Sequence, residues 1–90
     1  MKRIDPFTAL LPHLDLHGET YETMGYLLSS FIKDNYIMGN YKVVVIHGRS
    51  GGVLKKRTIE LLKNNVYVNE FYIDTNNDGQ TIVELKKQVK

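Results

Sequence analysis

The spacing of apolar residues changes several times along the chain. Between residues 13 and 17 polar and apolar side chains alternate with period two, which is typical of a half-buried strand. Beyond Gly18, apolar residues recur every three or four positions, as on the buried side of a helix, and Gly39 provides a left-handed stop. The four consecutive β-branched residues 43–46 then predict a central strand that is buried on both faces.

The later part of the chain predicts a second helix and a hairpin. Because Asp78-Gly79 supplies the positive φ that a tight turn needs, we expect the hairpin to turn at residues 76–79. The predicted elements are a strand at 13–17, a helix at 19–38, a strand at 41–46, a loop at 47–52, a helix at 53–64, and strands at 66–74 and 81–85. With right-handed crossovers, this β-α-β-α-β-β order predicts an α/β two-layer sandwich, in which two helices cover one face of a mixed four-stranded sheet.

Length and composition indicate one small domain. The chain has 90 residues, of which 42% are hydrophobic. Since a chain of this size buries only about 60–65% of its unfolded surface, we expect a shallow groove suited to a large ligand rather than a deep cavity. The predicted boundaries are an extended arm at residues 1–12, a folded domain at 13–86 and a basic tail at 87–90.

The chain has no cysteine, which excludes disulfides and cysteine-based zinc sites and is compatible with a reducing compartment. No apolar run approaches the roughly 18 residues of a membrane helix. Asp5, Pro6 and Pro12 interrupt the start of the chain, which therefore does not resemble a signal peptide. We expect a soluble, cytoplasmic protein without a membrane partner.

Charge is distributed unevenly, although the net charge is only +2. Residues 1–41 carry three basic and five acidic side chains, whereas residues 42–90 carry nine basic and five acidic ones. Within the second half, Arg49 and residues 55–57 form a basic cluster that no acidic residue interrupts. Such a cluster indicates either a phosphate-rich partner or merely a solvated face.

Two polar side chains mark the end of the first predicted strand. Strand alternation places Asp15 and His17 on the face opposite Leu14 and Leu16. Ligands of open α/β sheets bind at the carboxyl ends of strands, and histidine exchanges protons near neutral pH. We therefore predict a proton-transfer site at Asp15 and His17; the alternative is an exposed pair that only caps the helix start.

The loop at 47–52 is the second candidate site. Its glycines permit close approach of a ligand, and it leads into a helix N-terminus whose free N–H groups attract anions, with Arg49 and Lys55 adding positive charge. The alternative is a plain strand-to-helix connection. The loop also fits G-x-S-x-G, the nucleophile motif of hydrolases in which the catalytic serine precedes the acid and the histidine in sequence. All three histidines of this chain precede Ser50, so the chain does not have that order.

Together these motifs resemble the Smr (small MutS-related) domain family. Two signatures of the family stand here in full, L-D-L-H-G at residues 14–18 and G-x-T-x-V-x-L at 79–85, and Glu22 matches a glutamate that follows the first. The signature H-G-x-G, followed by a further glycine and a basic helix, is matched by H-G-R-S-G-G and the residues up to Lys55. The resemblance extends over residues 13–86. Ser50 stands where the family has the second glycine of H-G-x-G, and Gly51 follows it.

The resemblance implies a fold like that of the C-terminal domain of translation initiation factor three. It further implies nucleic-acid binding and endonuclease activity on DNA or on RNA, including messenger RNA on stalled ribosomes. The resemblance ties cleavage to Asp15 and His17, and it ties nucleic-acid contact and the shape of the site to the loop that begins with His47 and Gly48. From the chemistry of the residues we also count His47 as catalytic. We expect the loop and the basic cluster to contact nucleic acid, namely Gly48, Arg49, Ser50, Gly51, Gly52, Lys55, Lys56 and Arg57.

We favour RNA over DNA, because RNA carries its own 2′-OH nucleophile and can be cleaved by acid–base groups alone. His17 would transfer the proton, and His47 would act as a second acid or as a phosphate donor. No cofactor is expected beyond a divalent metal ion weakly held near Asp15. The alternative is a non-catalytic adaptor that binds nucleic acid or a ribosome, and the oligomeric state stays open.

Overall fold

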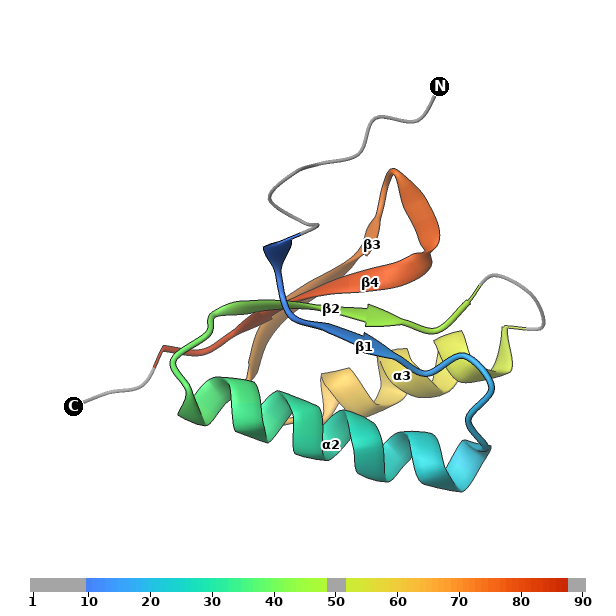
Figure 1. Ribbon diagram of the computed structural model, residues 1–90, viewed down its shortest axis with the longest axis horizontal. Helices are drawn as coiled ribbons and strands as arrows, with labels where there is room; N and C mark the ends of the chain where they lie inside the picture. Colours follow the sequence, from blue (N-terminus) through green and yellow to red (C-terminus); the bar gives the residue numbers. More distant parts are fainter. Residues whose placement is uncertain (1–9, 49–51, 88–90) are drawn as a thin grey trace.

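The computed structural model describes residues 10–48 and 52–87 and has the predicted element order (Figure 1). The elements are β1 (His13–Asp15), α2 (Tyr21–Ile37), β2 (Lys42–Ile46), α3 (Val53–Lys63), β3 (Val68–Asp74) and β4 (Asn77–Leu85). The sheet order is β1-β2-β4-β3, with β1 parallel to β2 and with β4 antiparallel to both of its neighbours. Figure 1 shows both helices on one side of this sheet, which confirms the predicted two-layer α/β sandwich.

The parallel pairing of β1 with β2 determines which residues lie together at one edge of the sheet. Because α2 crosses over between them, both strands run in the same direction, and their carboxyl ends meet at one edge of the sheet. Residues 15–18 after β1, residues 47–48 after β2 and the N-terminus of α3 lie at this end of the molecule (Figure 1). We call this region, residues 15–18, 47–48 and 52–55, the carboxyl edge.

The core lies between the sheet and the two helices. Its fully buried members are Leu16, Met24, Leu28, Ile32, Val43, Val45, Leu62, Val83 and Leu85. On the other face of the sheet Val44 pairs with Ile82, and these side chains are 0% and 5% exposed. The predicted burial of the β-branched strand on both faces is thus confirmed.

Helix α2 begins two residues later than the apolar spacing predicts, because Thr20 caps it. The Thr20 hydroxyl accepts the backbone N–H of Thr23 (3.1 Å), while the Thr23 hydroxyl accepts the backbone N–H of Thr20 (3.0 Å). Glu19 therefore precedes the helix, and its carboxylate accepts a hydrogen bond from the Thr23 hydroxyl. At the other end, Gly39 has φ 84°, as its predicted role in stopping the helix requires.

The predicted turn at residues 76–79 is wrong. Asn77 already pairs with Asp74, so β3 and β4 are joined through residues 75–76. The Asp74 carboxylate closes this turn by accepting the backbone N–H of Asn76 (2.9 Å). Gly79 lies within β4 and is not among the glycines with positive φ.

None of the described helices is long and apolar enough to cross a membrane.

Truncation of a core leucine tests the two-layer arrangement. Leu28 is 1% exposed between α2 and the sheet, so Leu28→Ala should lower the free energy of unfolding by about 2–5 kcal/mol. The matched control is Leu10→Ala, since Leu10 is 84% exposed and its truncation should change stability by about 0.5 kcal/mol or less. Urea denaturation measures both, and equal effects of the two substitutions would contradict the assigned core.

Candidate nucleic-acid interface at the carboxyl edge

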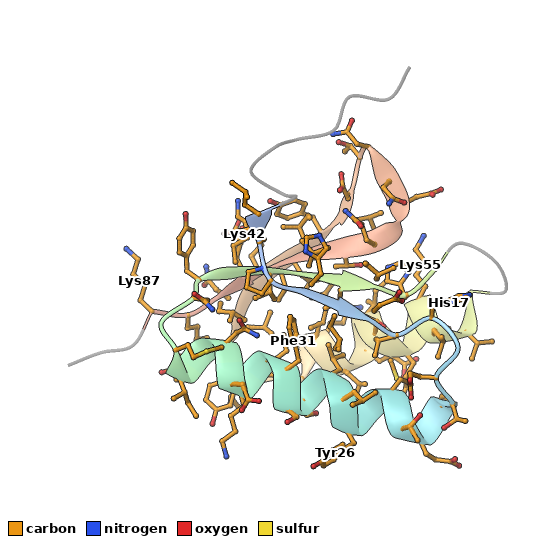
Figure 2. All side chains as sticks on the ribbon, in the orientation of Figure 1. His17, Tyr26, Phe31, Lys42, Lys55 and Lys87 are labelled. Atoms are coloured by element: carbon orange, nitrogen blue, oxygen red, sulfur yellow. The ribbon has the colours of Figure 1, made fainter. Side chains whose placement is uncertain are left out.

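Strand pairing brings the two sequence signatures together. Asp15 lies opposite Ile46, and the next backbone N–H, that of Leu16, donates to the Ile46 carbonyl at 2.7 Å. The chain segments that continue into His17 and His47 therefore leave the sheet side by side. Figure 2 shows His17 and Lys55 at this same end of the molecule, whereas Lys42 and Lys87 lie at the opposite end.

The side chains of Asp15 and His17 are both exposed at this edge. The Asp15 carboxylate accepts the backbone N–H of His17 at 2.8 Å, and Gly18 then turns the chain with φ 85°. Asp15 thus positions His17 through the main chain and stabilises the turn after β1. The exposed imidazole of His17 is accessible to a substrate.

His47 is placed differently, because its side chain is only 3% exposed. Its Nδ1 lies 2.9 Å from the carbonyl oxygen of Gly48, and its Nε2 lies 2.9 Å from the hydroxyl of Thr81. A carbonyl only accepts, so Nδ1 carries the proton and Nε2 of the neutral ring accepts the Thr81 hydroxyl. Both ring nitrogens are therefore engaged within the protein.

Electrostatics favour the same neutral form of His47. Desolvation by burial lowers the pKa of this imidazole, and the positive charge of Lys55 lowers it further. The hydrogen bond to the Gly48 carbonyl and the negative charge of Asp78 oppose this shift in the pKa without reversing it. Burial and neutrality favour a positioning role for His47 over the proton-transfer role expected from the sequence.

Residues of the G-x-T-x-V-x-L signature form hydrogen bonds with the start of the loop at 47–52. The carbonyl oxygen of Gly79 accepts the backbone N–H groups of His47 (3.0 Å) and Gly48 (2.9 Å), and Thr81 binds the His47 ring from the same strand. Gly79 and Thr81 were not predicted as site residues. Their signal in the sequence is the G-x-T spacing, which places two residues on one face of a strand.

The N-terminus of α3 completes the described part of the edge. Gly52 is its N-cap with φ 69°, and no described side chain caps the first turn. The first N–H groups of the helix are thus available to an anion at the positive end of the helix dipole. The half-buried Lys55 in this turn adds positive charge near His47.

The predicted basic cluster divides between two surfaces. Lys56 is exposed, but the guanidinium of Arg57 lies over the ring of Tyr21, 4.5 Å from its centroid. The Nε of Arg57 is buried and has no hydrogen-bond partner among the described residues. Arg57 thus packs against α2 rather than extending the cluster. The remaining predicted loop residues, Arg49, Ser50 and Gly51, lie outside the described residues.

A metal ion in a protein is held by several ligand side chains that lie close together. Nowhere in residues 10–48 and 52–87 do three or more His, Cys, Asp or Glu side chains gather as they do around a metal ion. The weakly held divalent ion beside Asp15 therefore stays a prediction.

Comparison with known proteins relates this chain to a described family and its members. A family model for the Smr domain matches residues 14–86. Endonuclease MutS2 of Geobacillus sp. (strain WCH70) is 41% identical over 76 residues, which cover 81% of this chain and 10% of that protein. Endonuclease MutS2 of Halothermothrix orenii is 33% identical over 78 residues, covering 83% and 10%. The chain spans about a tenth of the length of these curated relatives.

Solved structures share the fold. The Smr domain of Thermus thermophilus MutS2 superimposes with a TM-score of 0.81 at 22% identity, over 84% of this chain and 99% of that chain. YdaL, a stand-alone small MutS-related protein from Escherichia coli, gives a TM-score of 0.74 at 21% identity, over 83% of this chain and 64% of that chain. At these identities the two structures support the architecture.

The buried neutral His47 predicts a pH dependence of stability. Because folding lowers its pKa below the usual value of about 6.5, its contribution to stability is fully present above that pH and is lost as the pH falls below it. Urea unfolding should therefore give a lower free energy at about pH 5.5 than at about pH 7.5. His47→Gln should reduce this difference, whereas His13→Gln, at an exposed position, should preserve it. An unchanged pH dependence in His47→Gln would contradict the assignment.

Proposed function

This chain belongs to the Smr domain family, as its sequence motifs indicate, and on that premise we propose that it binds nucleic acid at the carboxyl edge and cleaves RNA there. One observation supports the proposal: the exposed His17 and Lys55, which stands in the first turn of α3, lie at the same end of the molecule (Figure 2), and no described side chain caps that turn. A proton-transfer group and a phosphate-binding group thereby share one edge. The name endonuclease, which the MutS2 relatives carry, supports cleavage rather than binding alone.

Phosphate would bind where positive groups converge. The N–H groups of the first turn of α3 point toward the carboxyl edge, and Lys55 and Lys56 stand in that turn and the next. Backbone N–H groups and lysines bind phosphate regardless of sequence, which suits recognition of a nucleic-acid backbone. The shallow edge would take a long polyanion better than a small ligand.

The chemistry open to His17 is proton transfer. Its neutral imidazole would take the proton of the 2′-OH, whose oxygen attacks the adjacent phosphorus as the bond from phosphorus to the 5′ oxygen breaks. Solvent water would protonate the departing 5′ oxygen, which leaves a 2′,3′-cyclic phosphate and a 5′-hydroxyl. The N–H groups of α3 and Lys55 would stabilise the charge that develops on the phosphate oxygens.

RNA is favoured over DNA by the side chains at this edge. DNA lacks the 2′-OH, so its hydrolysis usually depends on metal ions held by several carboxylates. The described residues form no such group, and Asp15 already accepts a backbone N–H. Cleavage of RNA by proton transfer from the 2′-OH and to the departing 5′ oxygen does not require a set of carboxylates that bind metal ions.

A binding module without catalysis is the second candidate, and the burial of His47 favours it. With both nitrogens of His47 engaged, His17 is the one exposed imidazole among the described residues of the carboxyl edge. A single such group performs acid–base catalysis less well than a pair. In this case the same edge would bind structured nucleic acid or a ribosome as an adaptor.

Substitution of His17 separates the two candidates. His17→Ala should abolish cleavage of a labelled RNA and leave affinity within about twofold, because the imidazole transfers a proton rather than holding the backbone. His13→Ala is the matched control, since His13 is exposed at the other end of β1. Gel assays on single- and double-stranded RNA, and on RNA with a 2′-deoxy nucleotide at the cut site, measure the effect. Undiminished cleavage by His17→Ala, or cleavage at the deoxy position, would refute the proposed chemistry.

Substitution of Lys55 tests the phosphate site. Lys55→Ala should weaken binding of RNA and reduce the slope of log K against log salt by about 0.7–0.9, the value of one lost phosphate contact. Lys63→Ala provides the control, because Lys63 is an exposed lysine in the last turn of the same helix. Fluorescence anisotropy at several salt concentrations measures both variants. Equal slopes for both would place the phosphate contact elsewhere.

A further inference from the structure

Tyr21 begins α2 only four residues after His17. The residue is 52% exposed, although the guanidinium of Arg57 covers its ring from 4.5 Å. Tyr21 is thus a solvent-exposed aromatic residue at the start of α2, in contact with Arg57 of α3, the helix that carries Lys55. Neither the strand pairing nor the anion site at α3 requires such a residue.

The guanidinium of Arg57 covers one face of the Tyr21 ring. The guanidinium of Arg57 lies in the seam between α3 and α2, where a Cβ built on Gly25 would be 3.8 Å from its Nη2. Its Nε is buried and without a hydrogen-bond partner among the described residues, so the contact with the aromatic ring is a main interaction of this cation. An aromatic ring that is fixed on one side and open to solvent on the other is pre-organised to stack.

We propose that Tyr21 is a stacking subsite for an unpaired nucleobase next to the phosphate bound at the carboxyl edge. This inference rests on the proposed nucleic-acid function and adds a substrate class, RNA with an unpaired nucleotide at the site. Aromatic side chains stack on any base because every base has a π-face. Paired bases of a duplex are already stacked on their neighbours, so the subsite selects single strands and loops.

Charge at this position favours a base over a phosphate. Glu19 and Glu22 flank Tyr21 along the chain, and their carboxylates would repel a phosphate but not a neutral base. The positive groups for the backbone lie instead on α3, at Lys55 and at the first-turn N–H groups, which no described side chain caps. The two parts of a nucleotide would thus be bound by different helices.

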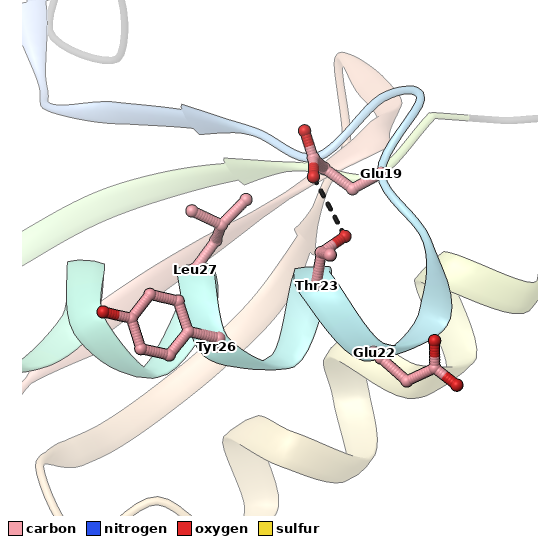
Figure 3. A pocket seen from close by; sticks show the side chains of 5 residues that line it. All are labelled: Glu19, Glu22, Thr23, Tyr26 and Leu27. Carbon is pink, nitrogen blue, oxygen red and sulfur yellow. Dashed lines mark hydrogen bonds between the residues drawn. The ribbon is translucent and has the colours of Figure 1, made fainter.

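Other exposed tyrosines fit this role less well. Tyr26 is 75% exposed, but it lines a shallow depression with Glu19, Glu22, Thr23 and Leu27 (Figure 3), none of which is a cation that could cover its ring. Tyr41 is 65% exposed, but it directly precedes Lys42 at the end of the sheet opposite His17 (Figure 2). Both serve as matched controls for loss of an exposed tyrosine.

The experiment compares binding of a labelled single-stranded RNA of about ten nucleotides with binding of its duplex by fluorescence anisotropy. Tyr21→Leu should weaken binding of the single strand by about 5- to 150-fold, the range that corresponds to one stacked base, while leaving duplex binding and the salt slope unchanged. Tyr21→Phe should retain wild-type affinity, because the ring and not the hydroxyl stacks. Tyr26→Leu and Tyr41→Leu should also bind as the wild type does, and thermal unfolding verifies that each variant is folded.

Each alternative outcome identifies what has failed. Wild-type affinity of Tyr21→Leu for the single strand would overturn the stacking subsite and leave the proposed nucleic-acid function intact. Equal weakening for single strand and duplex would show that Tyr21 supports the edge without selecting unpaired bases, which also overturns the inference. Absence of RNA binding by the wild-type protein would overturn both proposals.

Discussion

The buried imidazole of His47 connects the end of β2 to β4. Its ring binds Thr81, and the carbonyl oxygen of Gly79 binds two successive N–H groups at the same point. These hydrogen bonds hold the end of β2, the strand that pairs with β1 and that precedes α3 in the chain. The proposed function needs the proton-transfer group and the anion-binding helix at a constant separation, and the hydrogen bonds of His47 fix the end of β2, the strand that precedes that helix.

The spacing of apolar residues predicted most of the fold, because each helix or strand buries one face and its apolar residues therefore recur at a regular interval. The run of β-branched residues at 43–46 identified the central strand, and Gly39 identified the end of α2. Differences arose where side chains bind the backbone locally. Thr20 moved the helix start by capping it, and Asp74 closed the hairpin before the Asp-Gly pair that the sequence favoured. Such competition between nearby polar groups is not visible in apolar spacing.

The candidate site could be predicted only in part. That the ends of β1 and β2 meet follows from a right-handed crossover, which a sequence pattern reveals. The buried environment of His47 includes Thr81, 34 residues away in sequence, so it could not be read from the residue type alone. Arg57 likewise belongs by sequence to a basic run, but the helical turn directs it toward Tyr21. Whether a charged residue meets solvent or a neighbouring helix depends on packing that a linear pattern does not contain.

The strand order has a consequence for how the protein acquires its structure during synthesis. β4 is the last strand of the sheet in sequence, yet it lies between β2 and β3. A growing chain on the ribosome therefore cannot assemble the sheet until residues 77–85 have emerged, and β2 has neighbours on one side only before then. Pairing at this sequence separation is slow compared with helix formation. The two helices would thus form before the sheet is complete. The carboxyl edge would be completed last, because His47 binds Thr81 and its N–H donates to Gly79, both in β4.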